Sequence, residues 1–140
     1  MINYTIYTDG AYKYSLNTGG IGIVFLRNGQ KVFEHSDKYK DTTNQRMEMQ
    51  AVLVALYSIV KEIDSLTIIT DSMYVVGTLT KNWQRKANND LWNKLDIALS
   101  KAKKLVKTPI QFKHVKGHNG DKYNEQCDKL ASEACYEVEC

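Results

Sequence analysis

Apolar and β-branched residues come in short runs through the first third of the chain, with turn residues between the runs. These runs lie at residues 2–8, 21–26 and 31–36, and their composition is typical of β-strands. A polar loop from Ala11 to Thr18 separates the first two runs. Asn28-Gly29 separates the last two, which is the strongest short signal for a β-hairpin. The pattern therefore predicts three antiparallel strands.

The rest of the chain alternates apolar residues at helical spacing with further short apolar runs. A helix is predicted from the capping residues 41–44 to about Lys61. The elements expected after it are a strand at 66–70, a short helix at 73–80 capped by Ser72, a helix opened by Asp90 with an apolar face to Val106, a strand at 110–115 and a helix from about Asn124. Strands that follow helices favour parallel pairing through right-handed crossovers. The sequence thus predicts an α/β fold, one mixed sheet covered by helices.

Length and composition are those of one globular domain. The chain has 140 residues, 43% hydrophobic and 25% charged, enough for a single core. It contains no apolar run of bilayer-spanning length and no recognisable signal peptide, and its three cysteines fit no zinc spacing. We therefore expect a cytoplasmic protein with reduced thiols and no membrane partner. The net charge of +3 permits a polyanionic partner without requiring one.

Two of the predicted strands end in Thr-Asp, at Asp9 and at Asp71. Taken alone, Asp9-Gly10 is more often a simple turn. The repetition of the pattern changes this, because two neighbouring strands would bring the two carboxylates side by side. Close carboxylates repel each other unless a cation lies between them, and a divalent metal ion is the usual cation.

Three further residues have the chemistry to join such a site. Glu48 lies on the apolar side of its predicted helix, where an unpaired carboxylate costs several kcal/mol, in the range of about 2–7; the alternative is a glutamate at the rim of that face. Asp128 shares a helical face with Asn124, and its alternative is a helix salt bridge. His118 lies between two glycines in a loop. Four such acids on a small mixed sheet favour a hydrolytic site holding two Mg²⁺ ions about 4 Å apart.

A basic segment follows the short helix and contains Lys81, Trp83, Arg85 and Lys86. Trp83 among basic residues could stack on a sugar or a base. It could equally cover the edge of the core. The segment is therefore a candidate for contact with nucleic acid.

The chain closely resembles type 1 ribonuclease H. The matching motifs occur in family order and cover nearly the whole chain: Tyr7-Thr8-Asp9-Gly10, Thr43-Asn44-Gln45-Arg46-Met47-Glu48, Thr70-Asp71-Ser72, His114-Val115-Lys116-Gly117-His118, Asn124-Glu125 and Cys127-Asp128-Lys129-Leu130-Ala131. The resemblance implies a ribonuclease H-like fold with sheet order 3-2-1-4-5. It also implies endonucleolytic cleavage of RNA in RNA/DNA hybrids by two Mg²⁺ ions, with Mn²⁺ as a substitute, leaving 5′-phosphate and 3′-hydroxyl ends.

The resemblance also assigns roles to the five catalytic candidates. Asp9 would bridge both ions, and Asp128 would complete the ion that activates the water. Glu48 and Asp71 would complete the ion on the leaving-group side. His118 would assist proton transfer or product departure.

The residues expected to bind the hybrid are Thr43, on a DNA-strand phosphate, Asn44 and Gln45, in the minor groove, and the basic-segment residues Lys81, Trp83, Arg85 and Lys86. Two departures from the family stand out. Met73 occupies a position where many members carry Gln, and the segment between Trp83 and Leu91 lacks the basic handle that many members insert. We also expect no separate hybrid-binding module, so that residues 1–140 form one catalytic domain acting as a monomer.

Other readings of the same fold are a non-catalytic hybrid-binding module and a related nuclease such as an integrase or a Holliday-junction resolvase. The intact carboxylates and the loop His118 argue against the first. The Lys116-Gly117-His118 loop and the Asn124-Glu125 helix start favour ribonuclease H over the second. Met1, directly before the first strand, favours an independent gene product over a piece of a polyprotein.

Overall fold

The computed structural model describes residues 1–116 and 121–137. In these ranges the chain forms five strands and four α-helices, with one 3₁₀ turn, η1. In chain order they are β1 (Asn3–Lys13), η1 (Tyr14–Leu16), β2 (Thr18–Arg27), β3 (Gln30–Lys40), α1 (Asn44–Tyr57), β4 (Ser65–Thr70), α2 (Met73–Thr80), α3 (Asn89–Lys103), β5 (Gln111–His114) and α4 (Lys122–Ala134). None of the helices in the described ranges has the length and hydropathy needed to cross a membrane.

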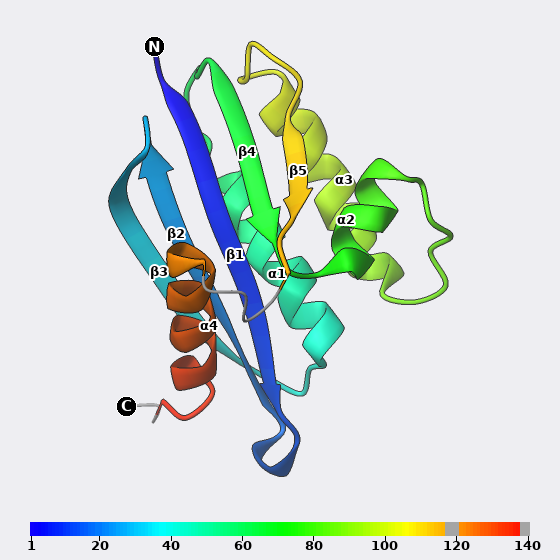
Figure 1. The fold of residues 1–140 in the computed structure, drawn as a ribbon. Coiled ribbons are helices and arrows are strands. Elements are labelled where there is room, and N and C mark those ends of the chain that lie inside the picture. Colours follow the sequence, from blue (N-terminus) through cyan, green and yellow to red (C-terminus); the bar gives the residue numbers. More distant parts are fainter. Residues whose placement is uncertain (117–120, 138–140) are drawn as a thin grey trace.

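The strands form one mixed sheet in the order β3-β2-β1-β4-β5 (Figure 1). The first three strands pair antiparallel, and β4 and β5 add in parallel. This arrangement confirms the predicted fold class and the sheet order that the resemblance implied. The first strand is therefore central, with a neighbour on each side.

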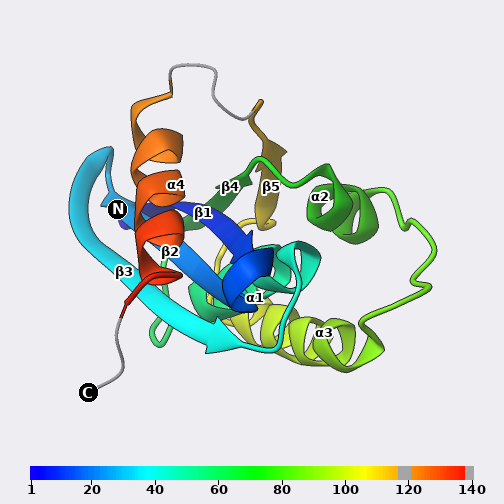
Figure 2. The same cartoon turned by 90° about the horizontal axis from the view of Figure 1, so that it is seen from below.

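Helices cover both faces of the sheet (Figure 2). α1 and α3 lie on one face, over a large core that includes Ile6, Ile23 and Trp92. α4 lies on the other face, over a small cluster of Val24, Leu26 and Cys127. Ile23 and Val24 belong to different clusters because successive side chains of a strand point to opposite faces.

Two glycines of β2 allow α4 to pack directly on the sheet. A Cβ atom at Gly20 would lie 2.1 Å from the Ala131 carbonyl oxygen, and one at Gly22 would lie 2.2 Å from the Cys127 carbonyl oxygen. No real Cβ tolerates such distances, so helix and strand approach this closely only because both positions are glycine. The approach matters for the site because Asp128 follows Cys127 on this helix.

The main error of the sequence prediction concerns the first hairpin. β1 does not end at residue 8 but continues to Lys13, and Lys13 pairs with Thr18 of β2. The expected loop is therefore mostly strand, with the single turn η1 at its tip. Pairing with β2 outweighs the turn preference of Asp9-Gly10. Other boundaries moved less: α1 ends at Tyr57, before Lys61.

Candidate active site

Asp9 lies at the place where β1 and β4 separate. Along β2, pairing continues past it, with Asp9 opposite Gly22. Along β4, the last pair is Thr8 with Thr70, and Asp71 comes immediately after Thr70. The two aspartates therefore stand at corresponding positions beyond the end of a parallel pair. In open α/β sheets, ligands commonly bind in such a crevice at the carboxyl ends of strands.

Glu48 reaches the same place from α1. The Gly10 backbone N–H donates a hydrogen bond to Glu48 Oε1 and another to Asp9 Oδ1, the latter at 2.9 Å. A Cβ at Gly10 would lie 2.4 Å from the Glu48 nitrogen and the Met47 carbonyl carbon. A glycine after Asp9 is thus required for the helix to come close enough, and Thr43 begins the helix as its N-cap, accepting from the Arg46 N–H at 3.1 Å.

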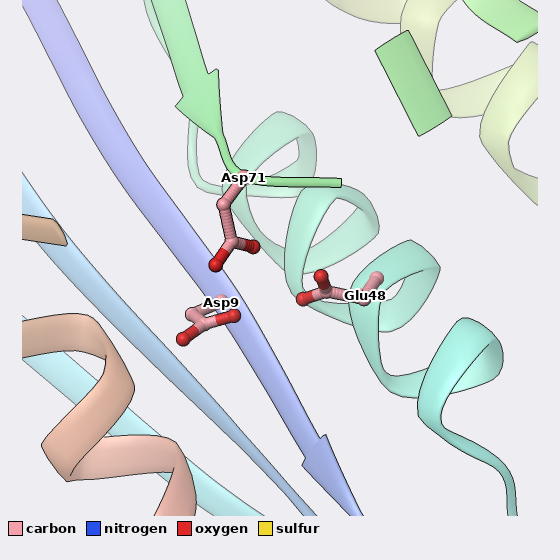
Figure 3. A group of neighbouring side chains, drawn as sticks. All are labelled: Asp9, Glu48 and Asp71. Atoms are coloured by element: carbon pink, nitrogen blue, oxygen red, sulfur yellow. The ribbon is translucent and has the colours of Figure 1, made fainter. Parts of the chain in front are cut away.

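The carboxylates of Asp9, Glu48 and Asp71 point toward one another (Figure 3), and one oxygen from each lies within 4.8 Å of the others. Asp9 is 3% exposed and Glu48 is 7% exposed. Burial, and then the charge of Asp71, raises the pKa of Asp9; burial, and then the charges of Asp9 and Asp71, raises the pKa of Glu48. Without a cation the cluster therefore retains protons that a bound divalent ion would displace.

Asp128 is not part of this group of three described residues, but it lies close enough for its charge to affect Asp9. Its negative charge also raises the pKa of Asp9. α4, which carries Asp128, is capped by Asp121, whose carboxylate accepts hydrogen bonds from the Tyr123 and Asn124 N–H groups, both at 3.0 Å. The predicted fourth acid is thus a neighbour of the cluster, on the opposite face of the sheet from α1.

Comparison with known proteins identifies the family to which this fold belongs. The family model described as RNase H matches residues 2–136. The chain belongs to the RNase H family.

Relatives match over most of their own length. The Ribonuclease H of Trichodesmium erythraeum is 39% identical over 150 residues, covering 96% of this chain and 90% of that protein. The Ribonuclease H of Desulforamulus reducens is 41% identical over 135 residues, covering 91% and 84% respectively. The crystal structure of LC11-RNase H1 in complex with RNA/DNA hybrid matches with a TM-score of 0.76 at 23% identity, over 94% of this chain and 96% of that one, which shows the shared fold.

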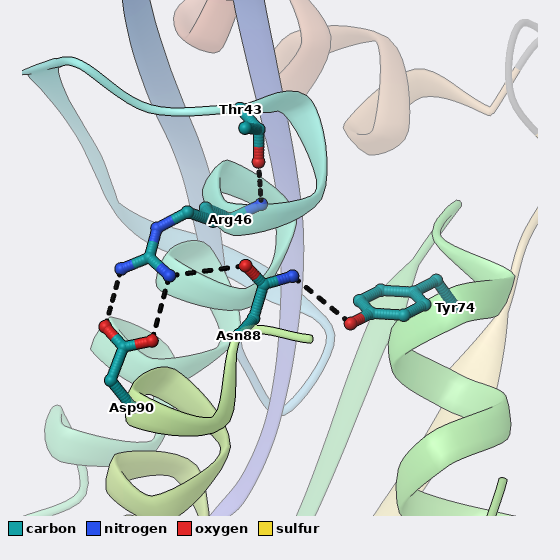
Figure 4. A network of polar contacts seen from close by, with 5 residues as sticks. All are labelled: Thr43, Arg46, Tyr74, Asn88 and Asp90. Carbon is teal, nitrogen blue, oxygen red and sulfur yellow. Dashed lines mark hydrogen bonds and ion pairs between the residues drawn. The ribbon is translucent and has the colours of Figure 1, made fainter. Parts of the chain in front are cut away.

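The residues that the RNase H resemblance assigns to the hybrid begin at the start of α1. Thr43, Asn44 and Gln45 are all exposed. Arg46, in the same turn, forms a two-pronged ion pair with Asp90 of α3, at 3.0 and 2.7 Å (Figure 4). The first turn of α1 is therefore anchored to α3 while its outward side chains stay open to solvent. No local sequence signal predicts this ion pair, because Arg46 and Asp90 are far apart in the chain.

Asn88 extends that anchor to α2. It takes a left-handed backbone conformation, with φ 62°, and accepts a hydrogen bond from Arg46 at 3.3 Å. Its amide donates to the Tyr74 hydroxyl at 3.3 Å (Figure 4). The end of the basic segment is thus fixed against both α1 and α2.

The basic segment packs on the rest of the protein through two of its side chains, Trp83 and Arg85. The Trp83 ring covers Gly77 of α2, where a Cβ would lie 2.3 Å from the ring, yet Trp83 remains 44% exposed. Trp83 therefore covers the edge of the core, while part of its surface stays open to solvent. Lys81 Nζ lies 5.9 Å from the centre of its ring.

Arg85 is held by contacts with side chains of α3. The Arg85 guanidinium pairs with both Asp96 oxygens at 2.6 and 2.9 Å and lies 5.1 Å from the centre of the Trp92 ring. Lys86 is exposed. The difference between the two lies in the internal partners of Arg85 on α3. The remaining candidate, His118, lies outside the described residues.

Proposed function

We propose that this chain is an endonuclease that hydrolyses the RNA strand of RNA/DNA hybrids and leaves 5′-phosphate and 3′-hydroxyl ends. The observation that carries the proposal is the convergence of Asp9, Glu48 and Asp71 from β1, α1 and the end of β4 in a chain about 40% identical to proteins named Ribonuclease H. The proposal includes cleavage that depends on two divalent metal ions.

The donor set fits Mg²⁺, with Mn²⁺ as a substitute. It consists of carboxylate oxygens, which hard divalent cations prefer, and two of the three acids are buried with no cationic side chain among the causes of their pKa shifts. Asp9, Glu48 and Asp71 would hold the metal, with Asp128 completing the set. When bound, two such ions supply an activated water and charge stabilisation of the departing oxygen.

The protein's own residues prepare the site and orient the substrate. Pairing with β2 fixes the backbone of Asp9, and the Gly10 N–H holds Glu48 beside it. On the proposed hybrid side, Thr43, Asn44 and Gln45 would contact the nucleic acid at the start of α1. Contact with a ribose 2′-hydroxyl, which we assign to Glu48, would distinguish RNA from DNA. His118 would pass protons during cleavage or product release.

The basic segment would extend this contact along the backbone of the hybrid. Lys81 and Lys86 would neutralise phosphates, and the exposed part of Trp83 would stack on a sugar or a base. Because Arg85 already has an internal partner in Asp96, its contribution to binding would be the smallest of the basic group.

The test is cleavage of an end-labelled RNA strand annealed to DNA, with Mg²⁺ or with EDTA, beside an Asp71→Asn variant. We expect cutting that requires Mg²⁺, is lost in the variant, and spares duplex RNA, duplex DNA and single strands. Removal of a 5′-phosphate from the products by phosphatase checks the end chemistry. Failure of the folded wild-type protein to cut in either Mg²⁺ or Mn²⁺ would favour the non-catalytic binding module instead.

A further inference from the structure

Asp71 is held differently from the other two acids of the cluster. Asp9 lies within β1 and Glu48 lies within α1, so regular backbone hydrogen bonds fix both. Asp71 instead lies in the two-residue connection between β4 and α2. The direction of its carboxylate therefore depends on whatever holds that connection.

The end of β5 holds it from one side. His114 pairs in register with Thr70, and the next residue, Val115, donates its N–H to the Thr70 carbonyl at 2.9 Å. The His114 ring then reaches one residue further, with Nε2 3.2 Å from the Asp71 carbonyl oxygen. A carbonyl oxygen can only accept, so this hydrogen bond requires a proton on His114 Nε2.

On the other side, α2 holds the connection through Ser72. The Ser72 hydroxyl accepts a hydrogen bond from the Val75 N–H at 3.3 Å, and the Ser72 carbonyl accepts one from the Val76 N–H at 3.1 Å. The Ser72 N–H also donates to Thr70 Oγ1 at 3.1 Å. Ser72 thus accepts hydrogen bonds from two N–H groups in the first turn of α2. Among the described residues, the hydrogen bond to the Asp71 carbonyl comes from the His114 ring.

We infer that His114 is a positioning residue for Asp71. Its hydrogen bond fixes the peptide plane that follows Asp71, and this plane sets the direction in which the carboxylate leaves the backbone toward Asp9 and Glu48. The inference rests on the proposed function in one respect, because it takes Asp71 to be a metal ligand. Outer partners that orient metal ligands typically change metal affinity by about 10–100-fold when removed.

Three substitutions separate this role from a merely structural one. His114→Phe keeps a planar ring and removes the donor. His114→Gln places an amide nitrogen where Nε2 stands, whereas in His114→Asn the amide reaches only as far as Nδ1. The His114 side chain is exposed, so none of the three changes removes core packing. Gln111→Phe, at another exposed position of β5, controls for the added apolar ring.

The primary measurement is Mn²⁺ binding to the hybrid-free protein, followed by electron paramagnetic resonance, with thermal unfolding in EDTA alongside. We expect His114→Phe and His114→Asn to bind Mn²⁺ about tenfold more weakly. His114→Gln and Gln111→Phe should bind like the wild type, and all variants should unfold at similar temperatures in EDTA. In cleavage assays of His114→Phe and His114→Asn, the Mg²⁺ concentration needed for half-maximal rate should also rise about tenfold.

Wild-type Mn²⁺ affinity in His114→Phe would overturn the inference, as would a His114→Gln variant as weak as His114→Phe. A lowered unfolding temperature in EDTA that tracks the loss of binding would also overturn it, since it would show a structural role. A wild-type protein that binds Mn²⁺ through Asp71 but cuts no hybrid would refute the proposed function alone and leave the positioning role supported.

Discussion

Asp9 and Asp71 each lie one residue beyond Thr8 and Thr70, the last residues that pair between β1 and β4. The parallel register thus aligns the two carboxylates, while the antiparallel partner β2 continues past Asp9 and keeps its backbone in place. Glu48 completes the group from the helix layer. The cost of this arrangement is electrostatic, because burial and the neighbouring carboxylate charges disfavour the ionised forms of Asp9 and Glu48 and raise their pKa values.

Removing one charge from the cluster should stabilise the metal-free protein. Asp71→Asn keeps the shape of the side chain and removes a charge that raises the pKa of both Asp9 and Glu48. We expect the free energy of unfolding in EDTA to rise by on the order of 1 kcal/mol. Mg²⁺ should then stabilise the wild type and not the variant. Urea unfolding measures both effects, with Glu62→Gln as a control at an exposed acid; a variant less stable than wild type in EDTA would refute the idea.

Gly10→Ala should separate α1 from β1. The new Cβ would meet backbone atoms of Met47 and Glu48 at 2.4 Å, and backbone cannot move aside cheaply. We expect a loss of stability of about 1–3 kcal/mol, the usual range for overpacking, together with weaker Mn²⁺ binding. Gly29→Asn is the control for loss of a glycine without a steric clash, because nothing lies within 4 Å of the position of its Cβ, and asparagine is among the residues that best tolerate the positive φ there. Equal stability of the two variants, measured by denaturant unfolding, would contradict the required close approach.

Loss of the positive charge at Lys86 should affect hybrid binding, whereas its loss at Arg85 should mainly affect stability. Lys86→Gln should reduce the slope of log affinity against log salt by about 1, as expected for one lost phosphate contact, and leave stability unchanged. Arg85→Gln should lower stability by about 1 kcal/mol, because it loses the Asp96 pair and the Trp92 ring contact, and change the slope less. Hybrid binding titrated at several salt concentrations tests the pair. The prediction fails if Arg85→Gln has the larger effect on the slope.

The position of Trp83 should depend on a glycine in the preceding helix. Gly77→Ala places a Cβ 2.3 Å from the Trp83 ring and must displace it, although alanine favours the helix by about 1 kcal/mol. If the ring stacks on the hybrid, affinity should fall several-fold, since such stacking contributes about 1–3 kcal/mol. A double-mutant cycle with Trp83→Ala should show that the two losses do not add. Additive losses would mean that the two residues act separately.

The Arg46–Asp90 pair should stabilise the protein at neutral pH and not in strong acid. The guanidinium lowers the pKa of Asp90 from 3.8 to about 2. A lowered folded-state pKa contributes stability above the ordinary pKa, and that stability is lost as pH falls through the folded value. Asp90→Asn should therefore unfold at a lower temperature than wild type at pH 7, and the difference should shrink as pH falls toward 2 and vanish below pH 2. A difference that persists undiminished below pH 2, or that appears equally in Glu62→Gln, would contradict the prediction.

Local sequence signals were sufficient for the element types and for several caps. Ser72 caps α2 as predicted, Thr43, one of the capping residues expected at 41–44, caps α1, and Glu48 is buried as its place on the apolar side of the helix indicated. In each case the information lies within one element. The sheet order came from family resemblance, because the residues alone indicate only which pairings are possible.

The errors and omissions involve partners distant in the chain. Asp9-Gly10 carries a turn signal, but ten pairs with β2 keep the strand extended through it. Nothing near Arg85 indicates that its partner is Asp96 on the following helix, and nothing near Asp71 indicates the contact with His114, 43 positions away. Such tertiary contacts decide which charged side chains remain available to a ligand.

The separation of Asp9, Glu48 and Asp71 along the chain has a consequence during synthesis. β1 and β4 pair in parallel, with the hairpins and α1 between them, so their pairing is non-local and requires the intervening elements. Until it forms, the three acids are dispersed, hydrated and of ordinary acidity. A nascent or truncated chain that has not reached β4 therefore lacks the carboxylate cluster on which the proposed metal binding and cleavage depend, and the cluster appears only with the completed sheet.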